Sequence, residues 1–394
     1  MMPSTLQKLK TIAQDLTPKF AVCEASSSSG GLALAPSTGA LPRNRQQVSN
    51  LRRRTDEAHE PLIGKKKDPL FAVMSMCNEN KGKGTAEHFV RIVTGAPEPM
   101  TVLCFDCSIN DLERFCTGEQ HTVLSVDPTF NLGDFDVTVT TYRHLMLTNM
   151  SGNHPVMMGP LVIHQCKKFN TYHFFASLLV GLRPALRSLQ AFGTDGELVL
   201  SNAFQTVFTS AKHLRCFLHY KSNLDDKLKK LHVPKSVRTE FLRDIFGNLA
   251  ELEEGLVDAE DEECYEGSLC SLQNIWNDRE REFSDLPSFY EWFINNCKDT
   301  VKSSMLKLVR IAAGLGNPPQ PFYTNDVESH NNVIKQHTKY AAQELPQFVE
   351  KMKGLIATQK QEIERAVVGM GEYRLADMIH ANIFRCQKSK EREL

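Results

Sequence analysis

Three acidic residues stand at positions where a carboxylate is costly to bury. Asp127 ends the apolar half of the run VLSVDPTF, Asp195 ends a short apolar run, and Glu328 lies in the first turns of the segment NDVESHNNVIK. Buried like charges repel and raise one another's pKa unless a cation neutralises them. Carboxylate oxygens suit hard divalent ions, most simply Mg²⁺ or Mn²⁺. Two such ions about 3.5 to 4 Å apart can activate a water or a 3′-hydroxyl and stabilise the leaving oxygen of a phosphodiester.

The neighbours of Glu328 indicate a helix face suited to such a site. Glu328, then Asn331 or Asn332, then Lys335 recur at helical spacing and share one face. That face could supply a metal ligand, an amide for positioning and a cation for a DNA phosphate. Asn331 and Lys335 are the candidates on this face for contacts with a DNA phosphate. The alternative is an ordinary solvated helix face.

The elements around the carboxylates predict the fold. We expect strands at 123–130, 135–147 and 158–165, a helix within 170–189 capped by Asn170, a strand that breaks at Asp195-Gly196 into a helix, and a strand at 213–219. The order β-β-β-α-β-α-β favours an α/β fold of the ribonuclease-H-like kind, a mixed sheet with flanking helices on both faces. In such a sheet the first and fourth strands are neighbours. Asp127 would then lie beside Asp195, and a late helix could bring Glu328 above them.

Changes in composition and periodicity divide the chain into six segments. A Ser-, Gly- and Pro-rich tail precedes the core, and a helical stretch containing the acidic loop EEGLVDAEDEECYEG interrupts it. We predict a mobile tail with a short helix possible near its start (1–65), an α/β lead-in (66–122), the first part of the core (123–221), an all-helical insertion (222–315), the core helix carrying the glutamate (316–345), and C-terminal helices and tail (346–394).

The overall charge gives no sign of a polyanion partner. The chain has 46 Lys+Arg against 47 Asp+Glu, a net charge of −1, so a polyanion would have to be held by a local patch. The run at 221–238 is the best candidate, with Lys221, Lys229 and Lys230 as phosphate contacts, or else it is a solvated helix face. Basic clusters at 52–54 and 65–67 resemble a two-part nuclear import signal, or else lie in a solvated linker.

The cysteines predict an intracellular protein with reduced thiols. They number eleven, an odd and scattered set, so no disulfide framework is expected. The longest apolar run, 174–182, has about half the length of a membrane span, so no membrane partner is expected.

Cys216-x-x-His219 has the local spacing of half a zinc site without a second matching pair. On a regular strand the two side chains would point to opposite faces, so they can act together only if the strand ends near Cys216. A structural or active-site-shaping role and a plain buried cysteine with a satisfied histidine both remain open.

A second cysteine pattern includes Cys104, Cys107, Cys116 and His121. The segment INDLERFC, however, predicts a short amphipathic helix capped by Asn110 that buries Cys116 in the core, so we do not expect zinc. Asp134 and Asp136 follow Gly133 and are interpreted as turn and hairpin-edge residues.

Four blocks, VDPTFNLGDF, GTDGE, CFLH and NDVESHNNVIK, resemble in order the signature blocks of the Mutator-like (MULE) transposase domain. That family is a D-D-E nuclease with a helical domain inserted before its glutamate, and the resemblance runs over 102–338. It implies that Asp127, Asp195 and Glu328 bind two Mg²⁺ or Mn²⁺ ions, and that Cys216 and His219 form the family's C-x-x-H element.

The resemblance further implies metal-dependent DNA cleavage and strand transfer in the nucleus. DNA is then the partner, with several copies of the chain assembled on it and no small-molecule cofactor. A domesticated or degenerate relative that binds DNA or acts in transcription without cutting is the alternative. An unrelated α/β protein would place the three carboxylates apart.

Overall fold

The computed structural model describes residues 68–376 apart from 82–87, 97, 130–131 and 249–250. Before residue 68 it describes 18–28 and the short pieces 6–7, 9, 12, 37, 41–42, 46–48 and 50. The chain divides into two compact units, Met1–Lys67 and Asp68–Leu394. In the first, helix α2 (Pro18–Ser27) contributes to a small buried cluster with Leu9 and Val48. The predicted mobile tail is therefore helical over these ten residues, whose run KFAVCEA is less polar than the rest. The basic clusters at 52–54 and 65–67, and most of the short helix considered near the start, lie outside the described residues.

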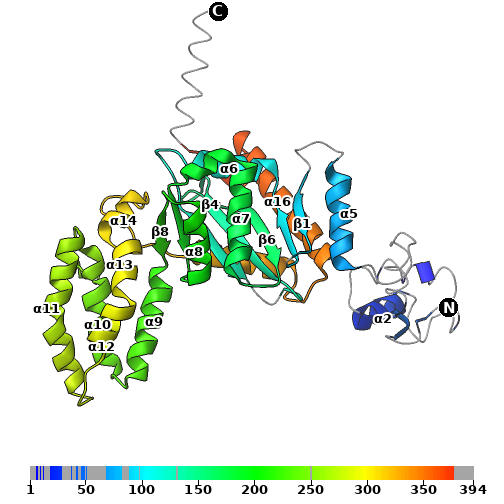
Figure 1. The fold of residues 1–394 in the computed structure, drawn as a ribbon. Helices are drawn as coiled ribbons and strands as arrows, with labels where there is room; N and C mark the ends of the chain where they lie inside the picture. Colours follow the sequence, from blue (N-terminus) through cyan, green and yellow to red (C-terminus); the bar gives the residue numbers. More distant parts are fainter. Residues whose placement is uncertain are drawn as a thin grey trace, which may run out of the picture. The chain divides into compact units, whose positions relative to one another are not determined.

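A seven-stranded mixed sheet forms the centre of the second unit (Figure 1). Its strands, in spatial order, are β1 (Val90–Thr94), β2 (Met100–Leu103), β6 (Val156–His164), β4 (Asp136–Arg143), β3 (Leu124–Thr129), β7 (Ala191–Thr194) and β8 (Lys212–Arg215). The pairs from β1 to β3 are antiparallel, and β3, β7 and β8 run parallel. The predicted α/β class is confirmed, and the lead-in contributes two strands to the same sheet. The predicted first and fourth strands, β3 and β7, are neighbours.

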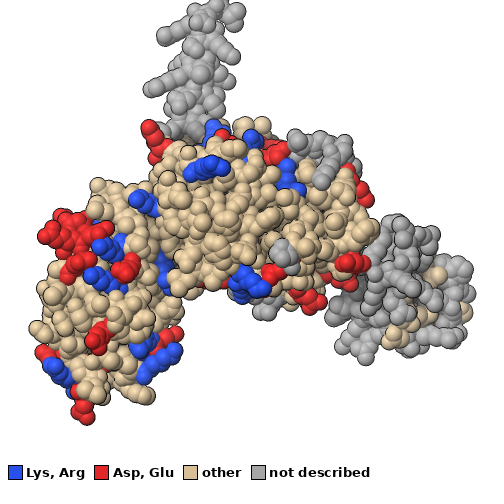
Figure 2. Space-filling model, in the orientation of Figure 1, with Lys and Arg blue, Asp and Glu red and all other residues tan. Residues whose placement is uncertain are grey.

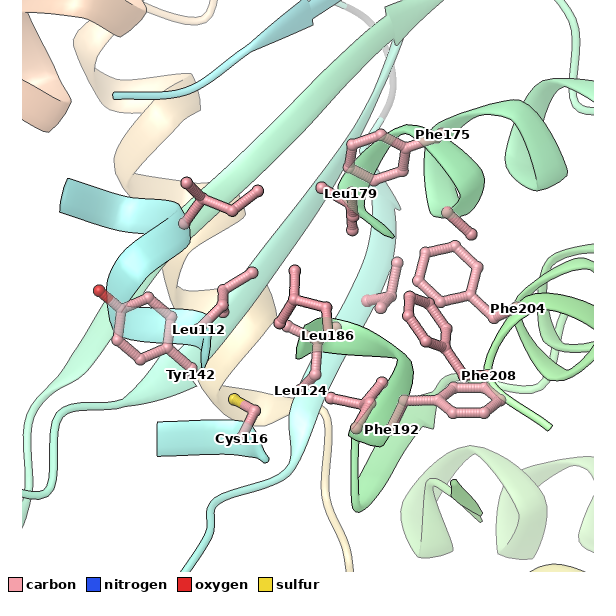
Figure 3. Close-up of a cluster of buried hydrophobic side chains, with 14 of the residues drawn as sticks. Leu112, Cys116, Leu124, Tyr142, Phe175, Leu179, Leu186, Phe192, Phe204 and Phe208 are labelled. Atoms are coloured by element: carbon pink, nitrogen blue, oxygen red, sulfur yellow. The ribbon is translucent and has the colours of Figure 1, made fainter. Parts of the chain in front are cut away.

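Strand β3 separates apolar from polar side chains by its alternation. Leu124 and Val126 point into a large apolar cluster, while Ser125, Asp127 and Thr129 are buried on the other face. The apolar face is covered by helices α6 (Asp106–Cys116), α7 (Phe169–Leu182) and α8 (Leu198–Val207), and Figure 3 shows their side chains around Leu124 and Phe192. The polar face of β3 is covered differently, by a helix from much later in the chain.

That later helix is α15 (Asn325–His337), which packs on β3 and β4. The long helix α16 (Leu345–Val367) and α5 (Pro69–Lys81) cover the rest of the same face and bury a second apolar cluster against β4 and β6. After α16, strand β9 (Tyr373–Leu375) pairs with β5 (Leu147–Asn149) to form a short two-stranded sheet. β9 lies in the segment 346–394, which was predicted as helices and tail.

A group of helices lies beside the β8 edge of the sheet (Figure 1). It contains α9 (Phe217–Lys230), α10 (Lys235–Phe246), α11 (Glu262–Arg281), α12 (Phe289–Asn296), α13 (Lys298–Ser304) and α14 (Lys307–Ala312). These helices bury a core of their own around Trp276, Phe241 and Phe289. Arg310 is 2 % exposed and donates hydrogen bonds to the carbonyls of Met305, Pro319 and Val257. Its bond to Pro319 connects this core to the linker 313–324, which leads into the helix that follows.

Three local predictions are wrong. The strand predicted at 213–219 ends at Arg215, because burial at Phe217, Tyr220 and Leu224 follows helical rather than strand spacing. Asn170 does not cap α7, since the backbone carbonyl of Lys168 accepts from Thr171 and Tyr172. Helix α6 begins at Asp106, four residues before the expected cap Asn110, where Arg91 holds the Asp106 carboxylate at 2.6 Å.

No helix among the described residues is long and apolar enough to cross a membrane. The surface over α7 and α8 carries few charged side chains, as Figure 2 shows. This face therefore offers no broad basic patch for a polyanion.

Candidate functional site

Asp127, within β3, and Asp195, just after β7, lie beside each other on two neighbouring parallel strands. The β3–β7 ladder pairs Leu124 with Phe192 and Ser125 with Gly193, and the same offset places Asp127 opposite Asp195, one residue after β7 ends. Neighbouring strands lie about 4.8 Å apart, so the two carboxylates leave adjacent backbones. Asp195 also turns the chain into α8, because its Oδ1 accepts the Glu197 backbone N–H at 3.1 Å.

Helix α15 closes over Asp127 and contacts it directly. The Asn331 amide, 6 % exposed, donates to Asp127 Oδ2 at 2.7 Å. Val327 and Ile334 are buried on the same side of the helix and anchor it to the sheet. Asn331, predicted as a phosphate contact, is therefore occupied with Asp127, because the buried stripe of the helix passes through it. It is a positioning group for a carboxylate.

Burial raises the pKa of Asp127 to about 7. Loss of solvent around the side chain is the largest cause, and the charges of Asp195 and Glu328 raise the pKa further. The Asn331 hydrogen bond acts in the opposite direction. The three predicted acids are therefore close enough to interact electrostatically, and Asp127 is the most buried of them.

Glu328 lies on α15 with its side chain 46 % exposed. Its Oε1 accepts from Thr324 Oγ1 at 3.2 Å and lies 3.6 Å from His219 Nε2. Thr324, the residue before the helix, also lies 3.3 Å from His219 Nδ1. Glu328 is thus directed toward His219 rather than held against the two aspartates.

The C-x-x-H element spans the junction between β8 and α9, which lets both side chains act on one target. Cys216 immediately precedes α9 and is buried, and its Sγ accepts the Thr324 backbone N–H at 3.4 Å. His219, in the first turn of the helix, reaches the Thr324 side chain. Both residues therefore hold the start of the helix that carries Glu328.

The carboxylate oxygens at this edge of the sheet are suitable ligands for a hard cation, but the acids do not converge on one position. Among the described residues, no three His, Cys, Asp or Glu side chains converge closely enough to hold a metal ion. The buried carboxylate of Asp127 has three further acids nearby and a single amide donor, an arrangement that a divalent ion would relieve. Glu328 would have to exchange its contacts with Thr324 and His219 to join the other two.

A fourth carboxylate, Glu197, was not singled out from the sequence. It lies just before α8, accepts from the Tyr172 hydroxyl at 3.3 Å and contributes to the raised pKa of Asp127. Burial raises its own pKa. Its position two residues after Asp195, across the Gly196 turn, is the signal that could have identified it.

The predicted basic residues are only partly available. Lys229 pairs with Asp225 at 2.8 Å and Asp226 at 2.9 Å, so its charge is neutralised within α9. Lys221 lies over the Phe246 ring at 5.6 Å, and Lys230 is exposed. On α15, Lys335 is half-buried at the edge of the buried stripe.

A cavity of about 480 Å³ lies at the start of β3. It is bounded by Ser125 and Thr141 of the paired strands, and by Tyr323 and Asp326 at and just before the start of α15. An ion pair between Asp326 and Arg143 closes one side. None of the three predicted acids lines this cavity.

Residues of the second cysteine pattern have separate surroundings. Cys104 and Cys116 are buried in the core, as expected for Cys116, while His121 lines the cavity. Asp134 is exposed in the turn and Asp136 begins β4, as interpreted from the sequence.

No family model matches this chain, and no curated protein matches it significantly.

Proposed function

We propose that this chain is a D-D-E nuclease core of the Mutator-like transposase type, with a ribonuclease-H-like fold, acting on DNA phosphodiesters with Mg²⁺ or Mn²⁺. The observation that carries the proposal is the register of β3 and β7, which makes Asp127 and Asp195 neighbours beneath α15. The helices between β8 and α15 agree with the insertion that the resemblance implies before the glutamate.

Asp127, Asp195 and Glu328 would hold the metal ions, which when bound would activate the attacking hydroxyl and stabilise the leaving oxygen. Asn331 fixes the orientation of the Asp127 carboxylate through its 2.7 Å hydrogen bond. Thr324 and His219 hold Glu328 until it turns toward the aspartates.

A nicking assay tests the proposal. Purified protein is incubated with supercoiled DNA and Mg²⁺ or Mn²⁺, and conversion to the open circle is followed with and without EDTA. We expect metal-dependent nicking that Asp127→Asn and Asp195→Asn abolish. Asp134→Asn changes an exposed aspartate of the same hairpin and is expected to cut like the unaltered protein. Nicking that persists in Asp127→Asn would exclude the proposed site.

The second candidate function is DNA binding without cleavage, as in a domesticated relative. The contact of Glu328 with His219 and Thr324, away from the aspartates, favours it. It predicts DNA binding without nicking under any metal condition. Calorimetry separates the two, because the nuclease binds divalent ions through Asp127 and the non-catalytic relative does not.

Localisation in the nucleus and assembly of several copies on DNA belong to the same proposal. The basic clusters at 52–54 and 65–67 are the segments to test for import. If the two clusters act as the import signal, replacing the basic residues of both by alanine should leave a fluorescent fusion of this protein in the cytoplasm.

A further inference from the structure

The side-chain amide of Asn331 is satisfied at only one of its two polar atoms. Its Nδ2 donates to Asp127 Oδ2 at 2.7 Å, whereas its Oδ1 is buried and has no hydrogen-bond partner among the described residues. Asn331 is 6 % exposed, and Val327 and Ile334 on the same side of α15 hold it against the sheet. Because buried polar atoms are normally paired, an unpaired oxygen beside a carboxylate indicates a ligand.

The unpaired Asn331 oxygen can only accept, so it needs an N–H group, an O–H group or a cation. The three acids whose charges act on Asp127 are acceptors when ionised. The Thr129 hydroxyl, two residues after Asp127 on the same strand face, is also buried without a partner in the described part of the chain, so it does not serve this oxygen. A divalent cation would satisfy the oxygen and neutralise the acids at once.

The contact between Asn331 and Asp127 has the spacing of two ligand atoms on one metal ion. Oxygen ligands lie about 2.0 to 2.1 Å from Mg²⁺ in octahedral geometry, so neighbouring ligand atoms are about 2.9 Å apart. A half-turn of the Asn331 amide exchanges its nitrogen and oxygen without changing its shape, and brings Oδ1 to the position that now lies 2.7 Å from Asp127 Oδ2. A carboxylate oxygen and an amide oxygen would then lie side by side at a distance that one cation can bridge.

We propose that the Asn331 amide oxygen is a direct ligand of the first divalent ion, which it binds together with Asp127 and Asp195; this rests on the proposed function for the presence of the ion. Amide and carboxylate oxygens are both ligands that hard cations accept. Asp195 reaches the same place from the neighbouring strand. Glu328 is not required for this first ion, so it can keep its contacts with Thr324 and His219 while the ion binds.

Binding of Mn²⁺ to the full chain, without DNA, tests the proposal. Affinity is measured by calorimetry at pH 8, above the pKa of about 7 at which Asp127 ionises. Asn331→Leu keeps the approximate volume and removes the oxygen, so it should weaken binding about 10-fold or more. Gln336→Leu removes an exposed amide from the same helix and should bind like the unaltered protein. Glu328→Gln should weaken binding less than Asn331→Leu does, and the reverse order would overturn the proposal.

A second variant separates a metal ligand from a group that only orients Asp127. A thiolate binds soft Cd²⁺ well and hard Mg²⁺ or Mn²⁺ poorly. Asn331→Cys should therefore lose Mn²⁺ affinity and gain an ultraviolet thiolate–Cd²⁺ charge-transfer absorption, measured as the difference from the unaltered protein with its own cysteines. Gln336→Cys carries an exposed thiol on the same helix and should not gain this absorption with equimolar Cd²⁺. If Asn331→Leu does not fold, the absorption of Asn331→Cys decides the question.

Outcomes for this inference and for the proposed nuclease differ. If the unaltered protein binds Mn²⁺ and folded Asn331→Cys shows no thiolate–Cd²⁺ absorption, the ligand role of Asn331 is overturned whether or not the protein cuts DNA. The absorption, together with weakened Mn²⁺ binding, in a protein that never nicks would support this inference and contradict the nuclease. A protein that binds no divalent ion would overturn both.

Discussion

Replacement of Asp127 by Asn should make the protein more stable at neutral and alkaline pH. The pKa of Asp127 rises from its usual 3.8 to about 7 in the folded state, chiefly through burial and then through Asp195 and Glu328. This rise in pKa corresponds to roughly 4 kcal/mol by which the charged carboxylate destabilises the folded protein. Asparagine removes the charge, while its side-chain oxygen can still accept the Asn331 amide that now binds Asp127 at 2.7 Å.

The sign follows from proton binding. Below pH 3.8 both folded and unfolded protein hold the proton, so this group has no effect on stability. Between pH 3.8 and about 7 the unfolded chain loses the proton and the folded protein keeps it, so stability falls as pH rises. Above about pH 7 the full penalty is present. The stability of Asp127→Asn relative to the unaltered protein should therefore grow over this window and then level off.

Thermal melting in EDTA between pH 4 and pH 8.5 measures the effect. With about 2 °C per kcal/mol for a unit of this size, the difference should approach roughly 8 °C at the alkaline end. Asp134→Asn, at an exposed turn, is the control and should melt like the unaltered protein throughout. Added Mg²⁺ or Mn²⁺ at pH 8 should raise the melting temperature of the unaltered protein and not that of Asp127→Asn. If the melting temperature of Asp127→Asn equals that of the unaltered protein at pH 8.5 as well as at pH 4, the reasoning is refuted.

Three further changes test how the site is positioned. Gly193→Ala should cost about 1–3 kcal/mol, because its Cβ would collide with the Phe322 ring, and Phe322→Ala in the same chain should remove part of that cost in a double-mutant cycle. Arg310→Met should cost about 3–5 kcal/mol in chemical denaturation, since it leaves the Asp258 carboxylate and three carbonyls without their donor. Thr324→Val should cost about 1–2 kcal/mol in the same measurement, because it removes the hydroxyl that contacts Glu328.

The strand part of the site was predictable because it depends on local periodicity and strand order. Alternation in VLSVDPTF puts Leu124 and Val126 on one face and Asp127 on the other, and this pattern is visible in the sequence. A hairpin followed by crossover helices then predicts that β3 and β7 are neighbours. The register that aligns Asp127 with Asp195 comes from the pairing of Leu124 with Phe192 and of Ser125 with Gly193, which strand order alone does not fix.

Contacts between distant segments were not predictable in the same way. The helical spacing of Glu328, Asn331 and Lys335 defines a face, yet which of them meets the sheet depends on how α15 is rotated. Packing of Val327 and Ile334 sets that rotation and turns Asn331 onto Asp127. No spacing rule identifies such a contact from one sequence.

The end of β8 shows how an incorrect boundary hides a role. A strand continued to His219 would point Cys216 and His219 to opposite faces, whereas a helix beginning at Phe217 brings both to Thr324. The helical spacing of the apolar residues Phe217, Tyr220 and Leu224 was the signal available in the sequence. The same boundary leaves Arg215 at the strand end, next to Gly196 and over the Tyr220 ring.

The site combines a fixed half and a half that depends on the helical insertion. Asp127 is 8 % exposed and set by the β3–β7 ladder, so its position changes only if the sheet does. Glu328 is 46 % exposed and is held through Thr324 by residues of the β8–α9 junction. Arg310 connects the insertion to the linker that leads into α15. Val327 and Ile334 anchor α15 itself to the sheet, and Asn331 joins it to Asp127. Both halves of the site therefore meet on one helix, and only the side chain of Glu328 would have to turn for the proposed centre to form.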